Sequence, residues 1–200
     1  MPFISNGTTI LDNGAFSVSL GNQILLSEQT ASSSASVEFT SGIDSTYPIY
    51  HFEFINMHPA TDAVHFSFQG NAVGGSGFNE TITSTVFFAQ HREDDTSASL
   101  DYRADDDLAQ STSFQRLSES LGNGADESLS GTLQIFNPSS DTFVKHFIAK
   151  TNYIHYNNRS YNFYIAGYFN TTSAIDEIQF KMNSGNIDSG TIKLYGIKDS

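Results

Sequence analysis

The chain contains no cysteine and no tryptophan among its 200 residues. Without cysteine it has no disulfide framework, no thiolate metal site and no thiol nucleophile. This absence is compatible with any redox compartment. Because tryptophan is missing, the aromatic core must come from 17 Phe and 9 Tyr, residues that pack well on pleated β-strand surfaces.

Basic residues are scarce as well. Nine Lys and Arg stand against 22 Asp and Glu, which gives a formal net charge of −13. A chain this acidic repels phosphate backbones and anionic lipid surfaces, so we expect no nucleic-acid partner and no membrane partner. The charge fits a solvated surface, or docking onto a basic surface, and the sequence leaves both open.

Long apolar runs are also missing, since none approaches the roughly 20 residues that a membrane-spanning helix needs. The first seven residues have neither a basic region nor an apolar stretch, so they do not resemble a signal peptide. We expect the protein to be made and used without secretion by the usual route.

What the sequence does contain is alternation of apolar and polar residues with a period of two, the pattern of half-buried β-strands. Residues 50–54, 64–68, 161–169 and 178–182 are clear examples. Turn-forming pairs separate these runs, and only residues 108–121 have spacing that allows a helical turn. The pattern predicts an all-β protein: an antiparallel β-sandwich, jelly-roll-like, with an N-terminal extended arm.

The first 30 residues differ from the rest, because turn pairs alternate there with short apolar stretches. We interpret residues 1–30 as an N-terminal anchoring arm and residues 31–200 as the jelly-roll-like domain. The apolar stretches either add a strand to their own sheet or pack on a neighbouring subunit, and the sequence does not decide. The candidate partner-binding residues of the arm are Ile10, Leu11, Phe16, Val18, Leu20, Ile24, Leu25 and Leu26.

A tyrosine- and asparagine-rich stretch between residues 152 and 168 is the better binding candidate in the domain. Tyrosine rings beside amides suit flat sugar faces and protein interfaces alike. A sandwich face with partly exposed tyrosines would give the same pattern, so both interpretations stay open. The candidate ligand or interface residues are Tyr153, Tyr156, Tyr161, Tyr164 and Tyr168.

Two histidines and a glutamate form a metal hypothesis. His51 and His65 lie on the polar face of two strands that could be adjacent, and Glu53 shares the face of His51. Two imidazoles and a carboxylate make a credible ligand set. The spacing matches no motif, and solvent-facing histidines on strands are common, so we predict no metal from this set.

The polar, acidic region of residues 92–130 gives a second metal hypothesis. Calcium favours several carboxylates on one loop, and the weak candidates here are Asp105, Asp106 and Asp107. The D-x-D-x-D-G spacing of a calcium loop is missing, and three consecutive aspartates are typical of a solvated face. We therefore expect no metal and no cofactor.

Catalytic motifs are not evident. The chain has no G-x-S-x-G sequence, and no pair of carboxylates stands out from the other acids. We expect the protein not to be an enzyme.

Short segments spread over nearly the whole chain carry a family resemblance. They are residues 4–9 (ISNGTT), 40–47 (TSGIDSTY), 54–61 (FINMHPAT), 107–112 (DLAQST), 136–140 (FNPSS), 170–175 (NTTSAI), and, within the tail 180–197, 184–187 (SGNI) and 194–197 (LYGI). Together they resemble a group of small virion-associated β-sandwich proteins of marine tailed bacteriophages. The resemblance implies a virion protein and transfers no catalytic motif.

The leading hypothesis is a phage virion structural protein, a capsid decoration or cement protein that binds the shell through its N-terminal arm. It would be assembled into the virion in the host cytoplasm. Its partners would be the major capsid protein or tail components and copies of itself, for example in a trimer. The alternative is a tail-fibre or receptor-binding adhesin that recognises host surface glycans.

Overall fold

The computed structural model describes residues 3–5, 8–12, 15–16 and 22–198, and these residues form strands and no helix. The predicted all-β class is therefore confirmed. The strands are β1 (Phe3–Ser5), β2 (Thr8–Asp12), β3 (Ala15–Phe16), β4 (Gln23–Ser34), β5 (Val37–Phe39), β6 (Ile49–Pro59), β7 (Phe66–Ala72), β8 (Ile82–Arg92), β9 (Ala98–Tyr102), β10 (Gln115–Arg116), β11 (Leu129–Phe136), β12 (Lys145–His155), β13 (Arg159–Phe169), β14 (Ile175–Met182) and β15 (Ile187–Ile197).

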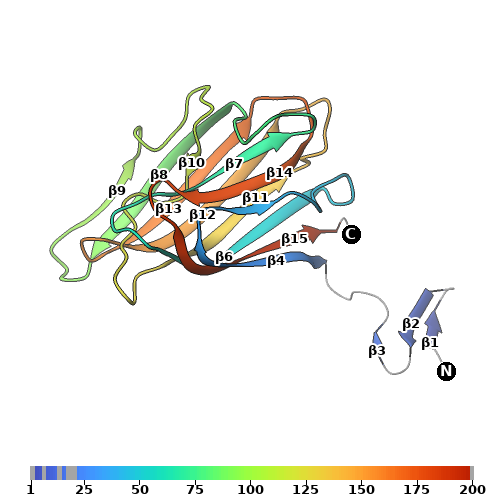
Figure 1. The fold of residues 1–200 in the computed structure, drawn as a ribbon, viewed down its shortest axis with the longest axis horizontal. Helices are drawn as coiled ribbons and strands as arrows, with labels where there is room; N and C mark the ends of the chain where they lie inside the picture. Colours follow the sequence, from blue (N-terminus) through green and yellow to red (C-terminus); the bar gives the residue numbers. More distant parts are fainter. Residues whose placement is uncertain (1–2, 6–7, 13–14, 17–21, 199–200) are drawn as a thin grey trace.

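Two antiparallel sheets make a sandwich with the topology of a jelly roll (Figure 1). One half of the large sheet has the order β4-β15-β6-β11, and the small sheet has the order β5-β14-β7-β10. Along the chain these eight strands alternate between the two sheets, except that β7 and β10 are neighbours in the small sheet, and this is the path of a jelly roll. The prediction of a jelly-roll-like sandwich is confirmed.

Two insertions widen the large sheet beyond the jelly roll. The hairpin β8–β9 lies between β7 and β10 in the chain, and the hairpin β12–β13 lies between β11 and β14. Their four strands extend the large sheet from β11 in the order β12-β13-β8-β9, so the sheet has eight strands against four in the small sheet. We call β8, β9, β12 and β13 the added strands.

Phenylalanine rings fill the space between the two sheets, as the composition predicted. Phe180 on β14 is at the centre of this packing. Its ring centroid lies 5.2 Å from those of Phe52 and Phe54 and 5.9 Å from that of Phe66. Alternation along β14 and β6 points these rings inward, because successive side chains of a strand lie on opposite faces.

The inner face of the added strands is covered by an irregular segment, residues 103–128. Leu117 and Leu121 from this segment are fully buried. The backbone N–H of Glu119 donates to the Tyr153 hydroxyl at 2.8 Å, and the Thr151 hydroxyl donates to the carbonyl of Leu117. The expected helical turn at residues 108–121 is wrong, since this region contains the short strand β10 and no helix.

The boundary of the N-terminal arm needs a correction. Strand β4 begins at Gln23 and pairs with β15 along its length, from Gln23 opposite Ile197 to Ser34 opposite Ile187. Residues 23–34 therefore belong to the sandwich and are not part of an arm or connector. Their backbone N–H and C=O groups form hydrogen bonds with β15. A solvated arm would have no such strand partner.

The predicted arm residues accordingly divide into three groups. Ile24 and Leu26 are partly buried in β4, Leu26 packs against the core, and Leu25 is 50% exposed. The strands that contain Ile10, Leu11 and Phe16 pair in a separate three-stranded sheet of order β1-β2-β3. Val18 and Leu20 lie outside the described residues.

The position of Phe180 leads to a stability prediction. The substitution Phe180→Ala should lower the free energy of unfolding by about 3–5 kcal/mol, because it removes a large buried side chain and leaves a cavity. Phe143→Ala, at a residue that is 70% exposed, should change it by less than about 0.5 kcal/mol. Urea unfolding followed by circular dichroism measures both. Equal stability of the two variants would contradict the central role of Phe180.

Candidate functional site

Side chains on the outer face of the large sheet line up in rows across the strands. One row crosses all eight strands in register. It consists of Glu28, Lys193, Glu53, Thr132, Lys150, Tyr164, Phe87 and Tyr102. Its charged acid–lysine–acid part lies on the jelly-roll strands, and its aromatic part lies on the added strands.

The aromatic part of this row is a stacked pair capped by a lysine. The rings of Phe87 and Tyr164 are nearly parallel, with centroids 4.9 Å apart and an interplanar angle of 6°. Lys150 Nζ lies 5.3 Å from the centroid of the Tyr164 ring. Because Tyr164 stacks on Phe87 and also lies beside Lys150, the Tyr164 ring does not offer a free flat platform of the kind that binds a sugar ring.

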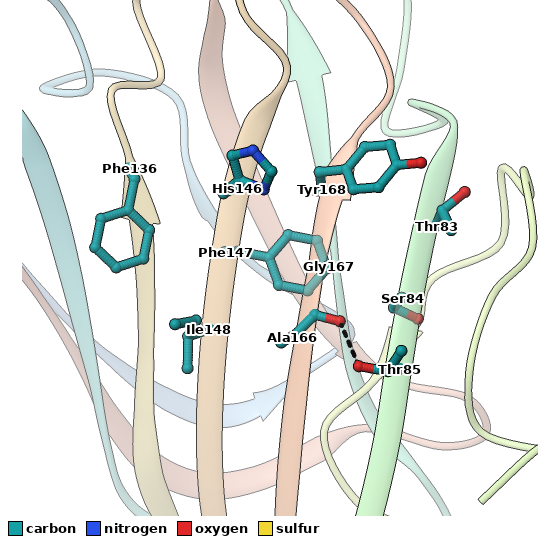
Figure 2. Close-up of a pocket in the computed structure, with 10 residues that line it drawn as sticks. All are labelled: Thr83, Ser84, Thr85, Phe136, His146, Phe147, Ile148, Ala166, Gly167 and Tyr168. Carbon is teal, nitrogen blue, oxygen red and sulfur yellow. Dashed lines mark hydrogen bonds between the residues drawn. The ribbon is translucent and has the colours of Figure 1, made fainter.

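Next to this row the outer face is hollowed into an apolar trough of about 420 Å³ (Figure 2). The small residues Ala166 and Gly167 of β13 lie between Ile148 on β12 and Thr85 on β8. His146 and Tyr168 lie together at one end, with ring centroids 5.9 Å apart. The trough is lined by Thr83, Ser84, Thr85, Phe136, His146, Phe147, Ile148, Ala166, Gly167 and Tyr168.

The close packing of Phe147 and the Thr83 backbone around Gly167 requires a glycine at this position. A Cβ atom at this position would lie 2.6 Å from the backbone oxygen of Thr83 and 2.7 Å from Cζ of Phe147. Both distances are shorter than real Cβ contacts. Glycine therefore allows the Phe147 ring to pack against the backbone of β13.

A second hollow of about 270 Å³ continues the trough toward the stacked pair. It shares Thr85, Ile148 and Ala166 with the first and adds Phe87 and Tyr164. The outer face of the added strands thus forms one apolar depression edged by aromatic rings. Apolar patches of this kind on a surface are typical of contact sites for other molecules.

The predicted tyrosine cluster is split between the two faces of the sheet. Tyr153 and Tyr161 are buried inside the sandwich, and burial raises the pKa of Tyr153 well above its ordinary value. Tyr164 and Tyr168 lie on the outer face, and Tyr156 lies in the turn between β12 and β13 with 49% of its surface exposed. The five residues therefore do not form one site. The period-two alternation could have separated Tyr161 from Tyr164 and Tyr168.

Sequence reasoning missed Phe136 and Ile148 of the trough and Phe87 of the second hollow. The strands of Ile148 and Phe87 are far apart in sequence. What brings them together is the strand order β12-β13-β8, which alternation alone does not encode. The available signal was the apolar Ile148 at an even position of β12, between His146 and Lys150 on the polar face of the strand.

The histidine metal hypothesis is wrong in its geometry. His51 lies on β6 in the large sheet, whereas His65 directly precedes β7 in the small sheet. Glu53 does lie beside His51, with a carboxylate oxygen 3.7 Å from His51 Nε2. Within the described residues, no group of three or more His, Asp or Glu side chains could hold a metal ion.

The three aspartates of the calcium hypothesis have separate roles. Asp106 is fully buried and accepts from Arg116 Nη1 at 2.7 Å and from Arg103 Nε at 3.0 Å, one arginine on each carboxylate oxygen. Asp107 accepts from the Tyr102 hydroxyl, and Asp105 is exposed. Since two guanidinium groups neutralise the buried Asp106 carboxylate, it is a structural ion-pair centre.

Three histidines are packed against the protein in an environment that disfavours their charged form. Burial lowers the pKa of His51, His65 and His155 below the ordinary value of 6.5. His155 stacks on Tyr161 with ring centroids 4.7 Å apart. Protonation of these rings therefore costs folding free energy.

No family model, curated protein or solved structure matches the chain. The resemblance to phage proteins therefore stays a prediction. In the part of the chain that the structure describes, no helix is long and apolar enough to cross a membrane.

The Asp106 ion pairs predict an effect on stability that is independent of calcium. Asp106→Asn should lower the free energy of unfolding by about 3–5 kcal/mol, because it leaves two arginines without their buried counter-charge. Asp105→Asn is the matched control and should have little effect. Urea unfolding with 5 mM Ca²⁺ or EDTA should give the same midpoint for the native chain. A rise with Ca²⁺ that Asp106→Asn abolishes would overturn this assignment.

The histidines predict the direction of a pH effect. Their folded-state pKa is lowered, so between that pKa and about 6.5 the unfolded chain binds more protons, and stability falls as the pH drops below about 6.5. Each kcal/mol lost corresponds to about 2–4 °C in melting temperature for a chain of this size. Thermal melts from pH 7.5 to 5.5 should show the decrease, and His155→Gln should make it shallower. An unchanged slope in this variant would contradict the role of His155.

Proposed function

We propose that this chain is a non-enzymatic virion structural protein that decorates or cements a phage capsid, with its N-terminal segment as the attachment to the particle. The observation that carries the proposal is the pairing of the strands. β1, β2 and β3 pair only with each other among the described residues, while the jelly roll is complete from β4 to β15. The N-terminal segment is therefore available for another surface.

The sequence of this segment supports the same role. It carries apolar residues at Ile10, Leu11, Phe16, Val18 and Leu20 within a strongly acidic chain. Binding to another surface would remove these apolar side chains from water, and each Å² of apolar surface that is buried contributes about 25 cal/mol to the free energy of binding. A shell built of repeated subunits provides many equivalent sites for such a segment.

The outer face of the added strands supports contact with other proteins of the particle or with further copies of the chain, for example in a trimer. Leu100 and Tyr102 on β9 are 69% and 58% exposed, and they extend the apolar surface of the trough to the edge of the sheet. Exposed apolar surface at a sheet edge favours protein contact over an isolated monomer.

The alternative proposal, an adhesin that recognises glycans, has less support. It relied on the tyrosines acting together, and two of the five are buried. Of the remaining tyrosines, Tyr164 stacks on Phe87 and lies beside Lys150, so its ring faces are engaged within the protein. The amides beside it are also engaged, since Asn162 Nδ2 donates to the Tyr164 hydroxyl at 3.1 Å.

Deletion of residues 1–22 tests the attachment proposal. The shortened chain should keep the melting temperature of the full chain, because it retains β4 and every jelly-roll strand. It should be incorporated at least tenfold less into particles of the phage that encodes it, measured by sedimentation and quantitative mass spectrometry. Equal incorporation of the two forms would overturn the attachment role.

Deletion of residues 1–34 is the matched control for folding. It removes β4 together with Ala31, which is buried, and Leu26, which packs against the core. We expect this variant to be unstable or insoluble. A stable fold without residues 23–34 would show that β4 is dispensable and would move the boundary of the attachment segment back toward residue 30.

A further inference from the structure

A small pocket on the small sheet, away from the trough of the large sheet, has a chemistry that the attachment role does not explain. It lies where β10, β7 and β14 meet in the small sheet and has a volume of about 280 Å³. It is lined by His65, Ser67, Phe114, Arg116, Lys181 and Asn183. Register places Lys181 opposite Ser67 and Ser67 opposite Arg116, so the two cationic residues flank one strand on the same face.

The side-chain acceptor atoms of Asn183 and His65 are already used. Asn183 Oδ1 accepts the backbone N–H of His65 at 2.7 Å, and His65 Nδ1 accepts the backbone N–H of Ser120 at 3.3 Å. The neutral His65 ring must then carry its proton on Nε2, and the Asn183 amide is left with its two N–H groups. Both side chains are therefore hydrogen-bond donors toward a ligand.

The two cationic residues add further donors and positive charge. Lys181 Nζ lies 4.0 Å from the centroid of the Phe114 ring and forms no ion pair within the described residues. Arg116 uses Nη1 on Asp106, and a guanidinium has five N–H groups. No carboxylate lines this pocket, although Asp and Glu outnumber Lys and Arg by 22 to 9 in the chain.

The protonation state of His65 reflects its burial and the positive charge around it. Burial lowers its pKa, and the nearby charge of Arg116 lowers it further, while Asp106 acts in the opposite direction. The ring is therefore neutral at pH 7. The pocket therefore combines several donors with two positive charges, of which Arg116 is paired with Asp106 behind the pocket and Lys181 has no ion pair among the described residues. No carboxylate stands in the lining itself, and such a set suits a bound anion.

We propose that this pocket binds an oxyanion: a sulfate, phosphate or carboxylate group held by Lys181, Arg116, His65 Nε2 and the Asn183 amide. The group could be a free inorganic ion or the charged group of an acidic saccharide, because both present the same oxygens. The volume of about 280 Å³ is ample for one such group. The site is independent of the attachment segment and of the trough.

Titrations of the full chain by NMR test this inference. Sodium sulfate, sodium phosphate and sodium glucuronate are added at pH 7 with ionic strength held constant by NaCl. Saturable shifts should appear at the His65 ring and the Asn183 side-chain amide. Lys181→Gln should weaken binding at least tenfold, since hydrogen bonds to charged groups contribute about 1.5–3 kcal/mol. Lys181→Arg should retain it.

Lys150→Gln is the matched control, because Lys150 also lies over an aromatic ring but on the opposite sheet. It should leave the affinity unchanged. Linear, non-saturating shifts with all three anions, or equal weakening by Lys150→Gln and Lys181→Gln, would overturn the proposal.

A sulfated disaccharide in the same titration distinguishes the two sources of the oxyanion. Binding at least tenfold tighter than inorganic sulfate would assign the pocket to an acidic saccharide. Equal or weaker binding would assign it to the free ion. Neither result depends on particle attachment, so the failure of this inference and the failure of the proposed function are separate outcomes.

Discussion

The large sheet of the sandwich has eight strands and the small sheet has four. The rest of the structure depends on how the inner face of the added strands is covered. The added strands carry apolar inner side chains such as Phe88 and Phe163, but the four strands of the small sheet do not extend far enough to cover them all. Residues 103–128 cover the remainder, and the buried Asp106 holds this segment through two arginines. A buried carboxylate is tolerated only because both of its oxygens are paired.

This arrangement links the interior to the oxyanion pocket. Arg116 belongs to the covering segment and binds Asp106 on one side while it lines the pocket on the other. The ion pair therefore fixes the position of one of the two cations that a bound anion would meet. A rigid donor set costs little to organise on binding, which is how a small pocket gains affinity.

The sequence predicted the parts of the fold that follow from local alternation. Phe52 and Phe54, or Phe163 and Ile165, are separated from their polar neighbours by the period of two, and the structure places each inside. It did not predict strand pairing, which is why it allowed His51 and His65 to be neighbours although they belong to different sheets. It left open whether residues 24–26 add a strand to the sheet, as they do in β4, and it missed β9, because a polar edge strand is stabilised by its neighbour in the sheet more than by its own pattern.

The surface chemistry changes at the boundary between the jelly roll and the added strands. On the jelly-roll side the outer row pairs Lys193 with Glu28, with Nζ 3.2 Å from a carboxylate oxygen, a solvated arrangement that contributes little energy. On the added side the same row becomes Tyr164, Phe87 and Tyr102, and the trough opens beside it. A jelly roll closes without these hairpins, so their apolar outer face is not explained by the needs of the core. Contact with another molecule therefore explains the apolar outer face of the added strands better than the packing of the core does.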